Sequence, residues 1–393
     1  MKIAHRAQTV EPFYAMSFGQ RAVELEAAGH HVVKLSLGEP DYGAPPAVRE
    51  AMREVMDGRP LPYTPALGLP VLRHAIADFY RDRHGVDVDP ARIAITSGAS
   101  SALLLVIAAT TEPGDEVLLA DPAYPCNRQL VASFGGRVVD VPTSPATRLQ
   151  LSASAVAEAW SERTSAVMMA SPANPTGTRI ASAELTAICA LARARGAWRI
   201  VDEIYLNLAD PEPDGGTVPT ILASDPDAIV VNSFSKYFGM TGWRLGWCVL
   251  PSALVEPVER LAMNYFLCAS APAQMAALAC FTPTSLALSE ERRRDLVERR
   301  RIVVDGLARL GLPVTVAPDG AFYAYFDVSS TGHDAWQFCE GALERAHVAL
   351  TPGRDFGTAT AHTHVRLSYA VSREELREGI ARLGPYVAAL RAS

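Results

Sequence analysis

The chain has 393 residues, of which 49% are hydrophobic and 20% are charged, and its net charge is −7. This size and composition indicate a folded protein of one large or two medium domains. The negative charge argues against a nucleic acid partner, and the longest apolar runs are too short to span a bilayer. Six cysteines without CxxC spacing favour reduced thiols and a cytoplasmic location over disulfides or a zinc site.

Seven short apolar segments between residues 92 and 250 predict β-strands. Helical patterns lie between them, including Ala99–Thr110 and Ser182–Arg195. This alternation predicts an α/β fold with a mostly parallel, seven-stranded sheet that is covered by helices on both faces. The predicted strands are Arg92–Thr96, Glu116–Ala120, Arg137–Val141, Ala166–Ala170, Trp198–Asp202, Ala228–Asn232 and Leu245–Leu250.

The C-terminal part of the chain has a different pattern and predicts a smaller α+β domain. Its expected elements are a charged helix at Glu290–Leu310, a helix at Trp336–Ala346, a strand at His364–Tyr369 and a final helix from Arg373. Acidic residues are interleaved with the arginines between 292 and 301, which favours a solvated helix face over an anion-binding patch. We expect an N-terminal segment, 1–45, that joins the small domain, a large domain, 46–285, and the small domain, 286–393.

Polar residues directly follow five of the predicted strands. In parallel sheets the ligand binds beyond the carboxyl ends of the strands, so these residues are expected to surround one site. They are Gly98–Ser100, Asp121–Tyr124, Ser171–Gly177, Asp202–Tyr205 and Ser233–Lys236.

The segment Thr96–Ser101 follows a strand and opens a helix. Its glycine and small residues let an anion approach the backbone N–H groups of the helix N-terminus. Similar loops are common in α/β proteins. The segment indicates an anion-binding site only if Ser233, Ser235 and Arg244 lie close to it in the fold. Together these groups would balance a phosphate dianion.

Lysine is rare in this chain. Of the 36 basic residues, 33 are arginine, and the three lysines are Lys2, Lys34 and Lys236. Arginine cannot supply a nucleophilic amine, because its guanidinium stays protonated. Lys236 lies in the apolar stretch VNSFSKYFGMTGWRLGW, beside small hydroxyls and a second cation, which predicts a Schiff-base lysine. The alternative is a chance lysine at the end of a buried strand.

The motif VDEIY places Asp202 at the end of a buried strand, where a carboxylate is costly unless it meets a cation. A protonated pyridine nitrogen would be such a cation. Tyr205 and Asn174 could then hydrogen-bond a phenolic oxygen on the same ring, and Tyr124 could stack on it. The alternatives are a helix cap for Asp202, a turn residue for Asn174 and a half-buried loop residue for Tyr124.

Arg366 lies inside an apolar strand, in VRLSYA, and therefore requires a partner. A substrate carboxylate held by two hydrogen bonds is one choice, and an internal salt bridge is the other. Gly38, in LSLGEPD, permits a bound acid to approach the backbone closely. Tyr63 lies in a loop rich in proline and glycine.

The motifs PANPTG, VDEIY, SFSK, GWRLGW and RLSYA occur in this order between Gly38 and Arg366. Together they resemble the class I and II aminotransferases, which are fold-type I pyridoxal-phosphate enzymes. The resemblance implies a homodimeric aminotransferase that exchanges an amino group between an L-amino acid and a 2-oxo acid by a ping-pong mechanism. The segments YPCNR and SFSKYFGMTGWRLGW are closest to bacterial members of the aspartate and valine–pyruvate types.

The resemblance also implies a role for each candidate residue. Lys236 would link covalently to pyridoxal 5′-phosphate, with Asp202 at the ring nitrogen, Tyr205 and Asn174 at the ring oxygen, and Tyr124 stacked on the ring. The phosphate would be bound by Ala99, Ser100, Ser233, Ser235, Arg244 and, from the neighbouring subunit, Tyr63. The substrate carboxylate would be bound by Arg366, Asn174 and the Gly38 backbone. Tyr42 stands where relatives often have phenylalanine, so it points towards the substrate pocket.

Other classes of function are compatible with parts of this pattern. A pyridoxal-phosphate-dependent C–S β-lyase would use the same cofactor residues, and the release of pyruvate and ammonia from a cysteine conjugate would identify it. A regulator with an aminotransferase-like domain would need an appended DNA-binding segment, for which this acidic chain leaves no room. A generic nucleotide-binding protein is disfavoured, because no GxGxxG motif follows the first predicted strand.

Overall fold

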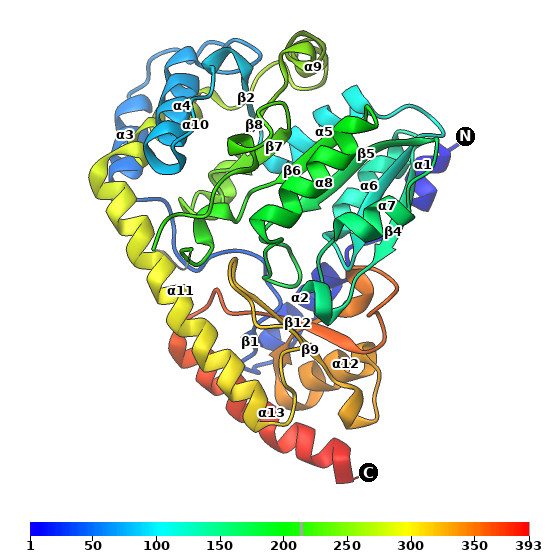
Figure 1. The fold of residues 1–393 in the computed structure, drawn as a ribbon. Helices are drawn as coiled ribbons and strands as arrows, with labels where there is room; N and C mark the ends of the chain where they lie inside the picture. The colour runs from blue at the N-terminus through cyan, green and yellow to red at the C-terminus, as the bar shows by residue number, and fades with distance from the viewer. Residues whose placement is uncertain (213–214, 393) are drawn as a thin grey trace.

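The computed structural model describes residues 1–212 and 215–392. At its centre is a seven-stranded sheet (Figure 1). Its strands are β2 (Ile93–Thr96), β3 (Glu116–Asp121), β4 (Arg137–Pro142), β5 (Thr164–Ala170), β6 (Trp198–Asp202), β7 (Ile229–Ser233) and β8 (Gly246–Val249). The order across the sheet is β2-β8-β7-β6-β5-β3-β4. β8 is antiparallel to both of its neighbours, and the other pairs are parallel.

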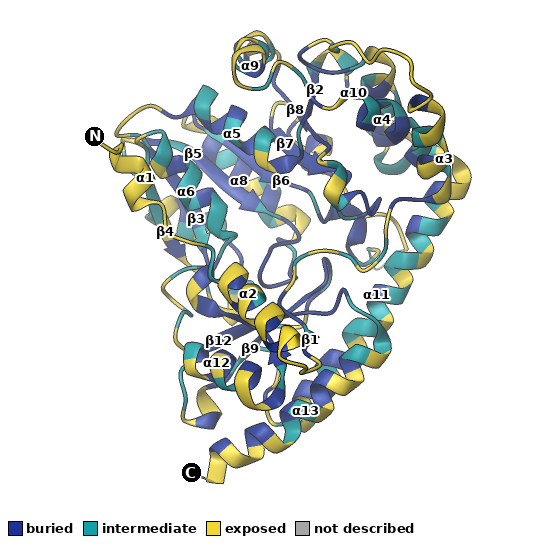
Figure 2. Ribbon diagram, turned by 180° about the vertical axis from the view of Figure 1, so that it is seen from behind, coloured by how far each residue is buried: buried dark blue, intermediate teal, exposed yellow. Residues whose placement is uncertain are grey.

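Every predicted strand overlaps one strand of this sheet, so the predicted α/β fold with a mostly parallel sheet is confirmed. Apart from β4, the strands of this sheet are buried along nearly their whole length, which is why they read as continuous apolar runs. β4 forms one edge of the sheet and is largely exposed or half-buried. Figure 2 shows that the central strands are mostly buried, whereas the helices around them carry both buried and exposed residues.

Helices cover both faces of the sheet. Successive residues of a strand point to opposite faces, so neighbouring residues pack in different cores. Met168 and Ile200 pack in one core with residues of α5 (Ala99–Thr110), α6 (Pro125–Ser133) and α9 (Ser252–Tyr265). Met169 and Val201, their direct neighbours in the chain, pack in a second core with residues of α4 (Pro70–His84), α7 (Ala153–Glu158) and α8 (Ser182–Ala194). The two cores hold the sheet as the middle layer of three.

The C-terminal part forms a smaller three-stranded sheet with helices around it (Figure 1). In this sheet β12 (His364–Ser368) is antiparallel to both β11 (Thr351–Pro352) and β9 (Tyr323–Asp327). The surrounding helices are α2 (Tyr14–Ala27), α12 (Ala335–Ala346) and α13 (Arg373–Ala392). Strand β1 (Val33–Lys34) pairs in parallel with β10 (Val348–Ala349), so the N-terminal segment lies against the C-terminal part. The predicted domain limits, 1–45, 46–285 and 286–393, remain a prediction.

The long helix α11 (Pro283–Arg309) runs from the large sheet towards the smaller one and packs against α13 (Figure 1). It begins seven residues before the predicted start at Glu290, because Thr282 caps its N-terminus and Pro283 occupies the first turn. The prediction of a solvated basic face was wrong in part. The side chains of Arg293, Arg299 and Arg300 are 12–14% exposed and form ion pairs with acidic residues.

The remaining α-helices are α1 (His5–Thr9), α3 (Pro46–Val55) and α10 (Ala271–Ala277). Within the described ranges, no helix combines the length and the apolar character that crossing a membrane requires.

Candidate active site

A cavity of about 420 Å³ lies beyond the carboxyl ends of β5, β6 and β7. Its volume lies within the usual range for sites that bind small molecules. The candidate residues that line it are Gly38, Ala99, Ser100, Tyr124, Asn174, Asp202, Tyr205, Ser233, Ser235, Lys236, Arg244 and Arg366. Polar residues that follow separate strands therefore share one space with residues of the N-terminal segment and the smaller sheet.

A larger hollow of about 1040 Å³ lies between the N-terminal segment and α6. Its arginines are already engaged, since Arg128 pairs with Asp140 at 2.7 Å and the Arg354 guanidinium lies 4.9 Å from the centre of the Tyr14 ring. No lysine is found among the described residues that line it. We therefore take the smaller cavity, which contains Lys236, as the candidate active site.

Lys236 lies three residues beyond the end of β7, and its side chain opens onto the smaller cavity. The Nζ atom donates a hydrogen bond to the backbone oxygen of Gly38 at 2.6 Å. Burial lowers the pKa of Lys236 to about 8; Arg244 and Arg366 act in the same direction, against Glu39 and Asp202. A lysine with this pKa is partly neutral near physiological pH, as a nucleophilic amine must be.

Asp202 is the last residue of β6, and it is 7% exposed. Its Oδ1 atom accepts a hydrogen bond from the backbone N–H of Ile204 at 3.0 Å. Burial raises the pKa of this carboxyl group to about 6. No ion pair to Asp202 is formed within residues 1–212 and 215–392, so the carboxylate is available to a cationic group of a ligand in the cavity.

Arg366 lies on β12 and is 1% exposed. One Nη atom donates to Asn174 Oδ1 at 2.8 Å, and the other donates to the Ser36 carbonyl at 2.6 Å and to Thr351 Oγ1 at 3.2 Å. The Nε atom is buried without a protein acceptor. All of these acceptors are neutral, and no acidic side chain of the described chain forms an ion pair with Arg366. The alternative of an internal salt bridge is therefore wrong, and this buried cation lacks an anion.

An anion-binding arrangement lies at the N-terminus of α5. Gly98 has a φ of +86°, and a Cβ atom at this position would lie 2.5 Å from the Arg244 guanidinium. Ser233 and Ser235 are joined through their Oγ atoms at 2.9 Å. The free N–H groups of the helix start, two hydroxyls and an arginine thus meet at one end of the cavity, where a phosphate dianion would be stabilised.

Tyr323, at the start of β9, lines the cavity and was missed by the sequence reasoning. Its hydroxyl is hydrogen-bonded to that of Tyr205 at 2.8 Å. A Cβ atom at Gly38 would lie 2.7 Å from the same hydroxyl, which explains why glycine is required there. The apolar alternation in AFYAYFDV indicates a strand, but nothing local to that stretch shows that its first tyrosine faces Tyr205.

Two candidate residues lie away from the cavity wall. The Tyr42 hydroxyl donates to the backbone oxygen of Lys236 at 3.3 Å, and the Arg292 guanidinium covers its ring at 4.4 Å from the centre. Tyr42 therefore supports the backbone of Lys236 from behind and does not line the pocket of its own chain. Tyr63 is 80% exposed on the loop between α3 and α4, so its predicted contact with the phosphate requires a second subunit.

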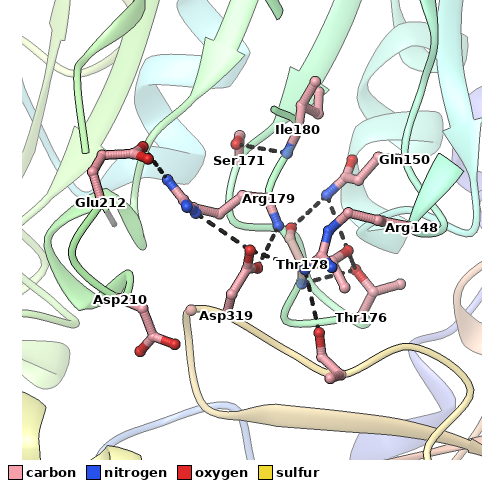
Figure 3. Close-up of polar contacts among 12 residues, drawn as sticks. Arg148, Gln150, Ser171, Thr176, Thr178, Arg179, Ile180, Asp210, Glu212 and Asp319 are labelled. Atoms are coloured by element: carbon pink, nitrogen blue, oxygen red, sulfur yellow. Dashed lines mark hydrogen bonds and ion pairs between the residues drawn. The ribbon is translucent and has the colours of Figure 1, made fainter. Parts of the chain in front are cut away.

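Hydrogen bonds and an ion pair to Asp319 hold the loop that carries Asn174 (Figure 3). Asp319 Oδ1 accepts the backbone N–H of Arg179 at 2.8 Å, and Oδ2 pairs with Arg148 at 2.9 Å. The backbone N–H groups of Asp319 and Gly320 both donate to the Gly177 carbonyl. These contacts join the loop after β5 to the segment that leads into β9, and so fix Asn174 relative to Tyr323.

The model of the family described as aminotransferase class I and II matches residues 30–383. The chain belongs to this family. The family resemblance stated from the motifs is therefore confirmed, and the C–S β-lyase alternative is not favoured.

The relatives of this aminotransferase agree in length as well as in sequence. It is 39% identical to a valine–pyruvate aminotransferase of Mycobacterium tuberculosis, over 98% of each chain. It is 34% identical to an aspartate/prephenate aminotransferase of Thermus thermophilus, over 97% of each chain. Among solved structures, an aminotransferase from Mycobacterium tuberculosis superimposes with a TM-score of 0.95, covering 99% of this chain and 100% of that one.

Aminotransferases of this family generally depend on pyridoxal phosphate, and the cavity of this one has a suitable group for each part of that cofactor. The glycine-lined start of α5 with Arg244 suits the phosphate. The buried, unpaired carboxylate of Asp202 suits a protonated ring nitrogen, and the amine of Lys236 suits the aldehyde. Transamination is the chemistry of the family, so this chain is a transferase.

Proposed function

We propose that this aminotransferase binds pyridoxal 5′-phosphate in the 420 Å³ cavity through Lys236. With it, the enzyme would exchange an amino group between an L-amino acid and a 2-oxo acid in two half-reactions. The observation that carries the proposal is that one cavity contains an amine of lowered pKa, together with a buried carboxylate and a buried arginine that form no ion pair within residues 1–212 and 215–392. Each of these groups is costly to bury unless a ligand completes it.

The proposed roles follow from the positions of the side chains. The bound cofactor would supply an electrophilic carbon and a ring that withdraws electrons from the substrate Cα atom. Arg366, whose side chain lines the cavity, would bind the α-carboxylate, while Asn174 keeps the guanidinium plane fixed. Lys236 Nζ would then remove the proton from the substrate Cα and later return one, as general base and general acid. Asp202 would keep a positive charge at the ring nitrogen.

We further propose a homodimer in which Tyr63 completes the phosphate site of the neighbouring subunit. The exposure of Tyr63 in the single chain supports this arrangement. We place the enzyme in the cytoplasm, a proposal that the six free cysteines support.

A half-reaction experiment tests the transamination. The cofactor-loaded protein is mixed with one L-amino acid, and its visible absorbance band is followed. We expect the band to disappear with formation of one equivalent of 2-oxo acid per site and to return when a different 2-oxo acid is added. Continuous release of ammonia and pyruvate from a cysteine conjugate, without any added oxo acid, would instead identify a lyase.

A further inference from the structure

All but one of the charged side chains that line the cavity have a role in binding the cofactor or the substrate in the proposed function. The basic side chains among its described lining residues are Lys236, Arg244 and Arg366. All three have roles in the proposed function, at the amine, the phosphate and the α-carboxylate. The remaining charged groups are acidic: Asp202, which would face the ring of the bound cofactor, and Glu39, which is exposed at the cavity wall.

The part of the wall that the N-terminal segment contributes is mainly apolar. Its apolar residues are Phe13, Ala15 and Met16 at the start of α2 and Leu37 before Gly38, and its charged residue is Glu39. The Phe13 ring meets the Tyr124 ring edge-on at 6.3 Å, so this wall adjoins the place where the cofactor ring is expected. Met16 and Leu37 are 66% and 37% exposed, which leaves their apolar surface available to a ligand.

This wall is held in place by a buried carboxylate. Asp355 accepts the backbone N–H of Tyr14 through Oδ1 and that of Ala15 through Oδ2, both at 2.8 Å. The Arg354 guanidinium lies over the rings of Tyr14 and Trp336 at 4.9 and 5.8 Å. The first turn of α2 is therefore a fixed boundary of the cavity.

We infer that this enzyme acts on L-amino acids with uncharged, apolar side chains and discriminates against dicarboxylic amino acids. The inference rests on the proposed function, because it takes Arg366 and Lys236 as the groups that fix the substrate backbone. A second carboxylate would be desolvated against Phe13 and Ala15 and would meet no cation from the described residues of its own chain, which is unfavourable. A branched or linear aliphatic side chain would instead gain by covering the same apolar surface.

Half-reaction rates give the first test. We expect kcat/KM for L-leucine, L-methionine or L-valine to exceed that for L-aspartate and L-glutamate by about 100-fold or more. Equal or higher values for L-aspartate would overturn the inference while leaving transamination intact. Inertness towards every amino acid would contradict the proposed function, and the binding experiment below would then decide the inference.

Binding of unreactive acids, measured by titration calorimetry, supplies a readout that does not depend on turnover. We expect 3-methylbutanoate to bind the cofactor-loaded protein at least about 10-fold more tightly than succinate. Met16→Lys, which places an ammonium at the wall, should shift this preference towards succinate by about 10-fold or more. Val23→Lys is the matched control, because Val23 lies on the same helix, is 50% exposed and does not line the cavity. Tighter binding of succinate by the unaltered protein, or equal shifts in both variants, would overturn the inference.

Discussion

At the scale of single residues, the cavity is defined by the buried groups Lys236, Asp202 and Arg366, none of which forms an ion pair in the described part of the chain. Arg366 donates only to neutral acceptors among the described residues, whereas Lys236 has its pKa lowered to about 8 by burial. We therefore propose different functions for the two cations: Arg366 binds the substrate, because a guanidinium stays protonated, and Lys236 reacts, because its amine can lose a proton.

Replacement of Arg366 should weaken substrate binding in both half-reactions. We expect Arg366→Ala to raise KM for the amino acid and for the 2-oxo acid by about 10- to 100-fold, because a charge-assisted bidentate contact is lost. Steady-state kinetics with both substrates measure this, and thermal unfolding controls for stability. An unchanged KM for either substrate would remove the proposed role of Arg366.

The lowered pKa of Lys236 predicts how cofactor capture depends on pH. An amine attacks an aldehyde only in its neutral form, which is present above the pKa. The rate at which cofactor-free protein captures pyridoxal phosphate should therefore rise with pH through about 8 and level off above it. Stopped-flow absorbance across pH 6.5 to about 10.5 measures the midpoint. A midpoint near the ordinary lysine value of about 10.4 would contradict the burial effect.

The residues that sequence reasoning placed in the site share one property: many follow a buried strand directly, or lie in a motif with a strong family pattern. Asp202, Asn174 and Lys236 are examples. Tyr323 and Phe13 could not be predicted in this way, because they reach the cavity through contacts with residues more than a hundred positions away. Tyr42 was assigned to the pocket from a substitution pattern, but its hydroxyl reaches the rear of Lys236 instead.

At the scale of elements, the predicted ends of the central strands and of α5 differ from the ends in the structure by two residues or fewer. Their limits coincide with abrupt changes from apolar residues to glycine, serine or charged residues, such as Ser97-Gly98 before α5. The start of α11 was missed because its cap, Thr282, and Pro283 lie outside the charged stretch that indicated the helix. Helix α2 was not among the predicted helices, although its first turn forms part of the cavity wall.

The cap on α2 gives a prediction about this element. Asp355→Ala would leave the N–H groups of Tyr14 and Ala15 without their acceptors and should lower the free energy of unfolding by about 1–2 kcal/mol. It should also raise KM for the amino acid several-fold, because the wall at Phe13–Met16 loses its anchor. Denaturant unfolding and steady-state kinetics measure the two effects.

Asp334→Ala is the matched control for this cap. Asp334 caps α12 through the N–H of Gln337, and α12 contributes no residue to the cavity. Its loss should cost a similar free energy of unfolding and leave KM unchanged. If both variants raise KM to the same extent, the role of Asp355 is general stability and not the position of the wall.

At the scale of the whole molecule, the cavity joins parts of the chain from Phe13 to Arg366, so the site exists only when the large sheet, the smaller sheet and the N-terminal segment are assembled. The order of the strands and the pairing of β1 with β10 could not be read from the sequence, because local patterns do not specify which strands become neighbours. The family resemblance supplied the expected architecture.

The proposed dimer with shared sites predicts complementation between two defective variants. Lys236→Ala and Tyr63→Ala homodimers should both be impaired, the first completely. A mixed dimer contains one site with both defects and one site with neither, so it should have about half of the normal activity. Because random pairing makes about half of the dimers mixed, co-expressed chains should recover about a quarter of the normal activity. Light scattering of the unaltered protein should give twice the chain mass. A monomer, or mixed dimers no more active than the parents, would contradict the shared site.

The most direct test of the account is the position of the covalent link to the cofactor. The protein is incubated with pyridoxal phosphate, reduced with borohydride and digested, and the modified peptide is identified by mass spectrometry. With three lysines in the chain, Lys2 and Lys34 serve as internal controls, and Lys34 is already paired with Glu26 at 2.6 Å. We expect stoichiometric modification at Lys236 alone, and none in Lys236→Ala. Unmodified protein, or equal modification of Lys2 or Lys34, would contradict it.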